Sequence, residues 1–533
     1  MRSTIGAALV VLLAALAVAG TAGAKQSKTG GTLNVDLATD VDFTDPSLSY
    51  LSTGWELEYA TCLKLVNYPD ANGPRASQLV PEAATGFPKV SNSGKTYDFT
   101  VAPTFTKFSN GQPVTAASFK AAIDRDADPK MQSPAGAFMA DIVGASSSPV
   151  SGVRVKGSHL LITMTHAAPD LLARLAMPFF CAVPASLPHD PNGVDTPPSA
   201  GPYYVANRVA NKSIVLKRNP YYKGKRPHNA DQIVYTVGNS LDATYLRVQQ
   251  GATDYAAGGI PPAAYAEAAQ KYGINKGQFW VKPLLNTSYL AFNTSRGVFK
   301  NNIALRKAVN QVIDRRAMLA QSGFLAGKRT DQILPPGMAG FRDADLYPLQ
   351  QPNIKAAQKL AQGHTGDGNV VLYEGNRGAS PLRAQIIQFN LKQIGLNVNV
   401  TLLPRAVQIQ KEGTRGEPFD IADESWGADY ADPYDFINVL LDGNNIQDSN
   451  NNNFSYFNDP KFNQQMMQAS LLSGTGRYTA YGNLDVAIMQ QAVPWAPRSN
   501  TNNRMLVSKR FGCFTYSAIY TVDLAAACLN NAG

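Results

Sequence analysis

The sequence predicts a mixed α/β fold with more than one domain, and three observations support this. The chain has 533 residues, which at about 100–200 residues per domain predicts two to four domains. Its composition, with 44% hydrophobic and 16% charged residues, is ordinary for a globular protein and excludes a disordered, collagen-like or coiled-coil chain. Residues 369–442 alternate short strand patterns with helix patterns, which is typical of an open parallel sheet.

The first 24 residues have the features of a secretory signal peptide. Arg2 gives the start a positive charge, and residues 5–20 form an apolar run of 16 residues. Ala22-Gly23-Ala24 fits the small-x-small cleavage pattern, so we expect cleavage after Ala24. The run is shorter than the ~20 residues that span a bilayer, and an uncleaved anchor is the alternative. We expect a periplasmic or secreted protein without an N-terminal lipid, because the first cysteine is Cys62.

Local patterns predict further strands and helices up to residue 321. Alternating apolar and polar residues predict strands at 32–37, 96–101, 160–165 and 213–218. Thr115 is a good helix cap and predicts a helix over residues 115–125. Apolar residues spaced along one face predict a single long amphipathic helix over residues 303–321.

Residues 369–442 carry the clearest pattern of the chain. Strands are expected at 370–373, 396–402 and 419–422, with helices at 380–394, at 407–412 and from Pro433 onward. The helix at 380–394 is expected to pack inward through Leu382, Ile386, Phe389 and Ile394. Right-handed crossovers would place the three strands in one parallel sheet.

Two loops of this unit leave strands at the edge where such sheets bind ligands. In open parallel sheets the ligand lies outside the carboxyl ends of the strands. The loop at 374–379 carries Arg377, and the loop at 425–432 carries Trp426, Asp429 and Tyr430. These side chains are the candidates for a binding site.

Four cysteines are present, an even number in a chain expected to be exported to an oxidising compartment. Of the three possible pairings we expect Cys62–Cys181, which joins two segments of one lobe, and Cys513–Cys528, which closes a short C-terminal loop. Buried free thiols are the alternative. The absence of a C-x-x-C motif argues against redox catalysis and against a thiolate zinc site.

Motifs for catalysis, metals and nucleotides are absent or incomplete. Residues 93–96 (SGKT) match the end of a P-loop, but Lys89 stands where its first glycine should be. Residues 124–135 begin like a calcium loop, but Pro129 and Ala135 replace its required glycine and glutamate. The motifs H-E-x-x-H, G-x-S-x-G and G-x-G-x-x-G are absent, and the net charge of +9 forms no basic patch with interleaved aromatic residues. We expect no catalytic residues, cofactor, metal or nucleic-acid partner.

Five segments, in order, resemble the extracellular solute-binding proteins of family 5, the peptide- and nickel-binding type. They are GGTLNVDLATDVDFTDPS (30–47), YDFTVAPTFTKFSNGQPVTAASFKAAIDR (97–125), GPYYVANRVANKSIVLKRNPYYKG (201–224), LAFNTSRGVFKNNIALRKAVNQVIDRRAM (290–318) and WGADYADPYDFINVLL (426–441). The resemblance covers essentially the whole chain after the signal peptide.

The resemblance implies a two-lobed type II periplasmic-binding-protein fold with a hinge and an extra subdomain in lobe one. We expect lobe one at 25–285 and 490–533, its extra subdomain at about 67–197, and lobe two at 286–489. The hinge is expected near 284–293 and 493–504. The resemblance further implies a monomer that delivers its solute to the permease subunits of an ABC importer.

The resemblance also assigns roles to four residues. Asp429 occupies the family position that receives a peptide's amino group, with a structural aspartate that caps the loop as the alternative. Arg377 is the candidate for the ligand carboxylate, or else a solvated loop arginine. Trp426 would form a wall of a side-chain pocket, or pack in the core. Asn293 would offer its amide near the hinge, or stabilise the end of a strand.

The function expected from these features is capture of short peptides outside the cytoplasm. The same kind of receptor for another solute, such as an oligosaccharide or a metal chelate, is the alternative, because a fold does not determine its ligand. A secreted hydrolase is a third possibility, but it would need a nucleophile and a base close together, and the sequence shows no such motif.

Overall fold

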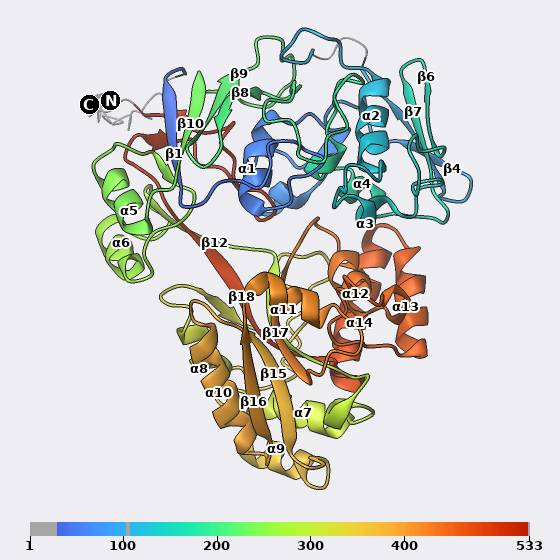
Figure 1. The fold of residues 1–533 in the computed structure, drawn as a ribbon, viewed down its shortest axis with the longest axis vertical. Helices are drawn as coiled ribbons and strands as arrows, with labels where there is room; N and C mark the ends of the chain where they lie inside the picture. The colour runs from blue at the N-terminus through green and yellow to red at the C-terminus, as the bar shows by residue number, and fades with distance from the viewer. Residues whose placement is uncertain (1–28, 103–106, 531–533) are drawn as a thin grey trace, which may run out of the picture.

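The computed structural model describes residues 29–102 and 107–530, and these residues form two α/β lobes (Figure 1). The expected signal peptide, residues 1–24, lies outside the described residues. Within them, no helix combines the length and the apolar character needed to cross a membrane.

The first lobe is built on a five-stranded sheet with the strand order β11-β1-β10-β9-β8. Its strands are β1 (Thr32–Leu37), β8 (Tyr203–Val209), β9 (Ser213–Arg218), β10 (Gln232–Val237) and β11 (Tyr255–Ala256). β1 runs parallel to β10 and β11, and the remaining neighbours are antiparallel. The strands predicted at 32–37 and 213–218 are confirmed, because their alternate residues, such as Leu33 and Leu216, fill the core beneath the sheet.

A separate four-stranded antiparallel sheet, β4-β5-β7-β6, lies at the far side of the same lobe (Figure 1). Its strands are β4 (Lys89–Ser91), β5 (Thr96–Thr100), β6 (Val153–Lys156) and β7 (His159–Thr163). The helices of the first lobe are α1 (Ser52–Thr61), α2 (Ala116–Asp126), α3 (Gly136–Met139), α4 (Leu171–Arg174), α5 (Leu241–Gln249) and α6 (Ala264–Tyr272). Thr115 precedes α2 as expected, and its backbone N–H donates to Ser118 Oγ at 3.1 Å. Three short pairs complete the lobe: β2 (Val66–Asn67) with β3 (Val80–Pro81), β19 (Phe511–Gly512) with β22 (Cys528–Leu529), and β20 (Tyr516–Ser517) with β21 (Thr521–Val522).

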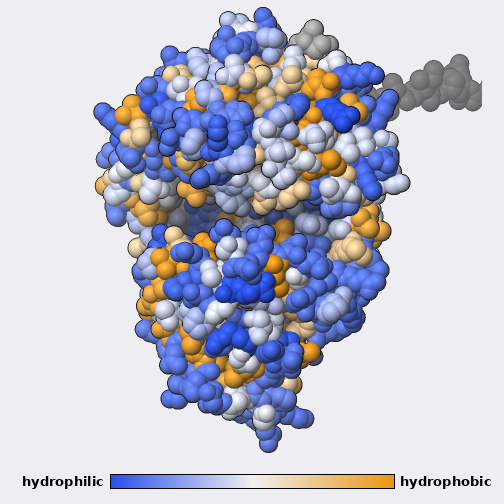
Figure 2. Space-filling model, turned by 45° about the vertical axis from the view of Figure 1, so that its right-hand side comes forward, coloured by the Kyte–Doolittle hydropathy of each residue, from blue (hydrophilic) through white to orange (hydrophobic). Residues whose placement is uncertain are grey.

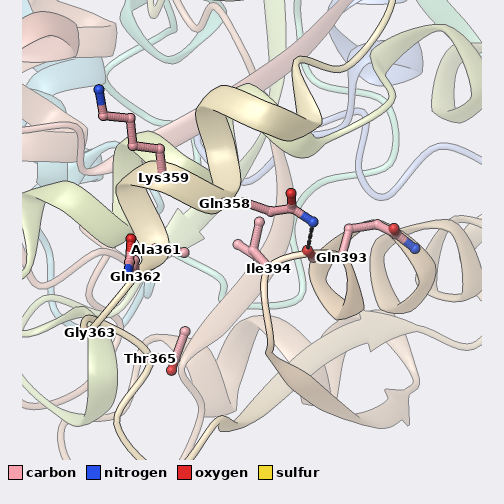
Figure 3. A pocket seen from close by; sticks show the side chains of 8 residues that line it. All are labelled: Gln358, Lys359, Ala361, Gln362, Gly363, Thr365, Gln393 and Ile394. Atoms are coloured by element: carbon pink, nitrogen blue, oxygen red, sulfur yellow. Dashed lines mark hydrogen bonds between the residues drawn. The ribbon is translucent and has the colours of Figure 1, made fainter.

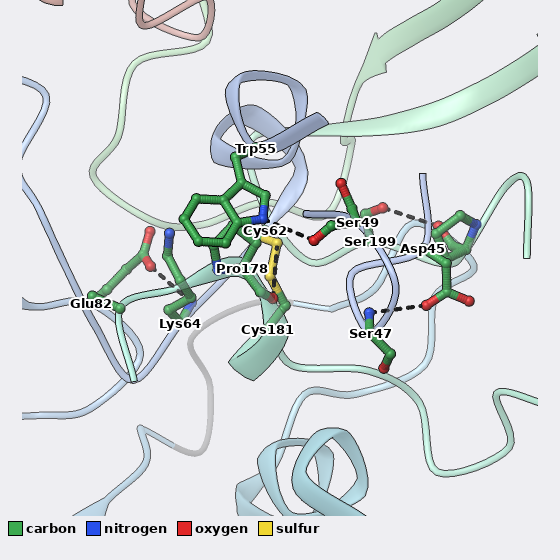
Figure 4. The surroundings of a disulfide bond; sticks show 12 residues. Asp45, Ser47, Ser49, Trp55, Cys62, Lys64, Glu82, Pro178, Cys181 and Ser199 are labelled. Carbon is green, nitrogen blue, oxygen red and sulfur yellow. Dashed lines mark hydrogen bonds between the residues drawn. A yellow bond between two sulfur atoms is a disulfide. The ribbon is translucent and has the colours of Figure 1, made fainter. Parts of the chain in front are cut away.

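Two disulfides join Cys62 to Cys181 and Cys513 to Cys528, the pairs expected from the sequence. Cys62 ends α1, and Figure 4 shows its bond to Cys181 beside Pro178 and under the ring of Trp55. The first disulfide therefore attaches α1 to a segment 119 residues further along the chain, whereas the second spans only 15 residues.

Removal of the longer crosslink should destabilise the protein more than removal of the shorter one. In the loop-entropy account, the double variant Cys62→Ala/Cys181→Ala loses about 5 kcal/mol of unfolding free energy and Cys513→Ala/Cys528→Ala about 3 kcal/mol. Urea denaturation of both variants and of the wild type measures the difference. Equal losses, or a larger loss for the C-terminal pair, would contradict loop entropy as the main contribution.

The second lobe is built on a seven-stranded sheet in the order β12-β18-β13-β17-β15-β16, with β14 pairing to β18. Its strands are β12 (Phe279–Pro283), β13 (Asn286–Phe292), β14 (Gly327–Arg329), β15 (Asn369–Gly375), β16 (Asn397–Leu403), β17 (Ile421–Gly427) and β18 (Trp495–Leu506). Its helices are α7 (Ile303–Val312), α8 (Arg315–Ala320), α9 (Ile354–Ala361), α10 (Ser380–Lys392), α11 (Arg405–Glu412), α12 (Tyr434–Leu441), α13 (Pro460–Ser470) and α14 (Gly474–Gln491). β15 pairs in parallel with both β16 and β17, so the parallel unit predicted for 369–442 is confirmed.

The long strand β18 connects the two lobes (Figure 1). It pairs with β12, β13 and β14 and therefore belongs to the lobe-two sheet, although the sequence boundaries assign β12 and β18 to lobe one. The boundaries at residues 285 and 489, and the hinge segments, stay a prediction.

The single helix expected over 303–321 is wrong. α7 ends at Val312, Ile313 is extended, and α8 begins after Asp314. The side chain of Asp314 accepts from the N–H of Ala317 at 2.8 Å, and its own N–H donates to Asn390 Oδ1 at 2.8 Å. A short acidic side chain that can cap a new helix competes with continuation of the old one, and here it starts the new helix.

The face through which α10 was expected to pack is wrong in part. Leu382 and Phe389 are 51% and 66% exposed and Ile386 is half-buried, whereas Ile394 is buried as expected. The helix itself packs on the core through Ala384, Ile387 and Leu391. Both faces of this helix are apolar enough to pack. Beside the face that packs, Arg383 binds the carboxyl groups of Asp423 and Glu374 at the end of the sheet.

Candidate functional site

The loop that follows β17 is where the second lobe contacts the first. Tyr50 Oη of the first lobe donates to the carboxylate of Asp429, at 3.1 and 3.2 Å from its two oxygens. Tyr430 Oη donates to Asp170 Oδ2 at 3.3 Å, and the N–H of Ala431 donates to Tyr68 Oη at 3.0 Å. Figure 2 shows that the surface is hollowed between the two lobes. Asp429 therefore lies at the boundary of the lobes, where a solute held between them would meet it.

Asp429 is a buried carboxyl group without a matching cation. It is 9% exposed, and none of the ion pairs between described residues includes it. Its one side-chain hydrogen bond comes from the neutral hydroxyl of Tyr50. Burial raises the pKa of Asp429 to about 7, and the bond from Tyr50 only partly opposes this. A cation that entered here would stabilise the charged form.

Asp435 is a second carboxyl group in the same loop region, and the sequence analysis did not single it out. It lies in the first turn of α12, where its Oδ2 accepts from the N–H of Asp429 at 3.0 Å and from Trp426 Nε1 at 3.2 Å. Burial and the charge of Asp429 raise its pKa well above the usual range. The sequence feature that could have indicated Asp435 is its position six residues after Asp429, at the start of the helix that Pro433 predicts.

Trp426 is half-buried, and its indole is engaged with Asp435. The apolar wall near Asp429 comes instead from the first lobe. There the ring of Tyr50 lies 5.7 Å from that of Trp55, 6.3 Å from Phe138 and 6.0 Å from Phe179, between ring centroids. Aromatic groups from one lobe and carboxyl groups from the other thus meet at the boundary.

A charged pocket of about 220 Å³ lies at the carboxyl ends of the parallel strands of the second lobe. It is lined by Glu374, Gly375, Arg377, Ser380, Arg383, Arg405, Gln408, Asp423, Glu424, Ser425 and Arg498. The loops at 374–379 and 425–432, which the sequence placed at this edge, contribute Arg377 and Ser425. The remaining arginines come from three other segments.

Three of the arginines in this pocket are matched by carboxylates. Arg383 Nε and Arg498 Nε each bind Asp423, at 3.0 and 2.9 Å, and Arg405 Nη2 binds Glu424 at 2.6 Å. Against the effect of burial, Arg498 and Arg383 lower the pKa of Asp423 to about 2. For Arg377, by contrast, no carboxylate of the described residues lies within ion-pair distance. An anionic group entering the pocket would therefore find Arg377 available.

Burial and the charge of Asp423 raise the pKa of Glu374 to about 9. Glu374 is thus neutral near pH 7, which leaves Arg383 shared between a charged Asp423 and a neutral carboxyl group. The pocket carries four arginines against three carboxyl groups, so its balance is positive. An arrangement of this kind favours an anion such as a carboxylate.

Asn293 is used within the second lobe. Its Nδ2 donates to the carbonyl of Phe419 at 3.1 Å, and its Oδ1 accepts from the N–H and the hydroxyl of Ser295 at 3.2 and 2.7 Å. Both ends of the amide stabilise the turn after β13, so these contacts offer no support for a ligand role.

A hollow of about 430 Å³ between α9 and the end of α10 is less suited to a ligand (Figure 3). Gln358 Nε2 donates to the carbonyl of Gln393 at 3.0 Å across it, while Lys359 points away from the other labelled side chains. It lies on the outer part of the second lobe and has no carboxyl group in its lining. In the part of the chain that the structure describes, no group of three or more His, Cys, Asp or Glu residues could hold a metal ion.

Comparison with known proteins gives a consistent result over most of the chain. The model of "Bacterial extracellular solute-binding proteins, family 5 Middle" matches residues 78–448. The periplasmic murein peptide-binding protein MppA of Escherichia coli (strain K12) is 25% identical over 459 residues, covering 82% of each chain. Heme-binding protein A of Haemophilus influenzae (strain ATCC 51907 / DSM 11121 / KW20 / Rd) is 25% identical over 392 residues, covering 70% of this chain and 69% of its own. The solved structure of clavulanic acid biosynthesis oligopeptide binding protein 2 superposes with a TM-score of 0.88 at 22% identity, covering 95% of this chain and 96% of its own.

Proposed function

The chain belongs to the bacterial extracellular solute-binding proteins of family 5, and on that premise we propose that it captures short peptides between its two lobes. It is a binding protein and not an enzyme. In the proposed role it is an exported monomer that delivers the peptide to the permease subunits of an ABC importer. The named relative that binds murein peptide supports a peptide ligand.

The observation that carries the proposal is the buried carboxyl group of Asp429, which has no cation partner among the described residues. The amino end of a peptide is an ammonium group, which is costly to bury unless a carboxylate meets it. Asp429 lies at the contact between the lobes, where the hydroxyl of Tyr50 now occupies its oxygens. The ammonium would replace that hydroxyl and add the missing charge.

The charged pocket would receive the other end of the peptide. Arg377 has no carboxylate partner among the described residues, and a guanidinium can bind a carboxylate through two parallel hydrogen bonds. Ser425 lines this pocket and lies four residues before Asp429 along the chain. At about 3.3 Å per residue the Cα atoms of Ser425 and Asp429 are at most roughly 13 Å apart, so Asp429 and the edge of the pocket lie within the length of an extended peptide of about four residues.

Binding of a peptide mixture tests the proposal directly. The protein without its first 24 residues is incubated with an equimolar pool of di- to pentapeptides, and native mass spectrometry identifies what stays bound. Each retained peptide is then compared with its N-acetylated and its C-amidated form by calorimetry. We expect acetylation to abolish binding, and amidation to weaken it in the wild type but not in Arg377→Gln. Failure of every peptide to bind, or equal binding of the acetylated forms, would contradict the proposal.

Another solute is the alternative, because one named relative is a heme-binding protein. A solute without an ammonium group would leave Asp429 buried and unmatched, so the burial of this carboxyl group favours a peptide. Retention of a heme or a sugar, and of no peptide, in the same mass-spectrometric assay would favour the alternative.

A further inference from the structure

Asp435 has one carboxyl oxygen that nothing in the described structure satisfies. Its Oδ2 accepts from the N–H of Asp429 and from Trp426 Nε1, which fixes the backbone of Asp429 and the indole. Its Oδ1 is buried and has no hydrogen-bond partner among the described residues, and the side chain is fully buried. An ionised oxygen in that position would be strongly destabilising, so it needs either a proton of its own or a donor from a ligand.

The charged groups around Asp429 and Asp435 are already paired with one another. Arg477 of α14 donates to both oxygens of Asp432, at 3.0 and 2.8 Å. Arg174 of α4 lies 3.1 Å from Asp170 and 2.7 Å from Asp141. The other titratable groups that face the two carboxyls are the hydroxyls of Tyr50, Tyr68 and Tyr430. Burial raises the pKa of these tyrosines, so they stay neutral. Within residues 29–102 and 107–530, therefore, no ion pair balances Asp429 or Asp435.

Two carboxyl groups that share a buried site cannot both ionise at low cost. Asp435 accepts from the backbone N–H of Asp429; burial raises the pKa of both carboxyl groups, and the charge of Asp429 raises that of Asp435 further. Asp435 Oδ1 is buried without a donor among the described residues and the pKa of Asp435 is raised well above the usual range, so the retained proton lies on Asp435.

We propose that Asp429 and Asp435 act as one carboxyl pair that keeps a proton in the free protein and releases it when the ligand's ammonium binds. The proton passes from the carboxyl pair to the solvent, and the ammonium, already charged, takes its place. Asp435 is then a positioning residue that orients Asp429 and supplies the second negative charge. This inference rests on the proposed function, because it assumes a ligand with an ammonium group.

Calorimetry in two buffers tests the exchange with the tripeptide Ala-Ala-Ala as the probe. The binding heat is measured at pH 7 in phosphate and in Tris. The two heats should differ by the number of protons released, about one, multiplied by the difference between the ionisation enthalpies of the two buffers. The affinity should also fall about tenfold for each pH unit below 7. Asp435→Asn keeps an acceptor for the N–H of Asp429 and for Trp426 but cannot hold the proton, so proton release and the pH slope should both decrease.

Asp442→Asn is the matched control, because it removes a carboxyl group that lies at the other end of α12 and accepts from the N–H of Asn444. It should behave as the wild type. If Asp435 had only a structural role, Asp435→Asn would weaken binding without changing the number of protons released. Equal heats in both buffers for the wild type would overturn the inference while leaving peptide capture intact.

Failure of Ala-Ala-Ala to bind would count against the proposed function alone. Infrared spectroscopy of the free protein tests the inference in that case. The wild-type spectrum at pH 6 should contain a protonated carboxyl band that the double variant Asp429→Asn/Asp435→Asn lacks. The band should disappear as the pH rises above 7. A difference spectrum with only ionised carboxylate bands at pH 6 would show that the pair holds no proton, and the inference would fail.

Discussion

Asp429→Ala should lower the affinity for a peptide with a free amino end by about 2–5 kcal/mol, the largest effect on binding that we expect from one side chain. The reason is that the peptide's ammonium would then be buried without a counter-charge, while the aromatic wall around Tyr50 cannot provide one. Calorimetry of wild type and variant with the peptide retained from the pool measures the loss.

Two companion measurements separate charge from shape. Tyr50→Phe removes the hydroxyl that now occupies the oxygens of Asp429 and keeps the ring, so its affinity should equal or exceed that of the wild type. The N-acetylated peptide should bind wild type and Asp429→Ala equally weakly. An unchanged affinity of Asp429→Ala for the free-amine peptide would remove Asp429 from the site and return it to a structural role in the loop.

The parts of this fold that could be predicted from the sequence are those that depend on neighbouring residues. β15, β16 and β17 are bounded by turns and show strand periodicity, and their parallel pairing follows from the helices between them. The capped start of α2 is equally local.

The errors have causes that lie far along the chain. The helix pattern by itself continues to residue 321, but Asp314 caps a new helix while Asn390 of another helix binds its backbone N–H. α10 has apolar residues on two faces, and the face that packs is the one beside which Arg383 binds Asp423 of another strand. Periodicity cannot report contacts of this kind.

The binding site shows the same limit. The family motif indicates Asp429, but Tyr50, which caps it, comes from 379 residues earlier in the chain. The charged pocket joins Arg383, Arg405 and Arg498 from separate segments, and no pattern in the sequence connects them. Even Asp435, only six residues from Asp429, becomes a candidate only when its burial and its unsatisfied oxygen are known.

The loop that carries Asp429 depends on a buried ion pair, and breaking it should have the largest effect on stability that we expect from a single substitution. Arg477 is 2% exposed and donates to both oxygens of Asp432, which in turn accepts from the N–H of Tyr434 at the start of α12. Arg477→Met leaves Asp432 buried without a cation, and we expect it to lower the free energy of unfolding by about 3–5 kcal/mol. Urea denaturation followed by circular dichroism measures this loss.

A second substitution shows whether the loss comes from the unpaired charge. Asp432→Asn keeps an acceptor for the N–H of Tyr434, so the double variant Arg477→Met/Asp432→Asn should recover part of the stability that Arg477→Met loses. Arg415→Met is the matched control, because its partner Asp448 is exposed and such pairs contribute about 0–1 kcal/mol. If Arg477→Met were no less stable than Arg415→Met, the ion pair would not be what holds the loop. Asp432 lies between Asp429 and Asp435 in the chain, so a loss of stability in Arg477→Met should also weaken peptide binding. The double variant should then recover stability and affinity together.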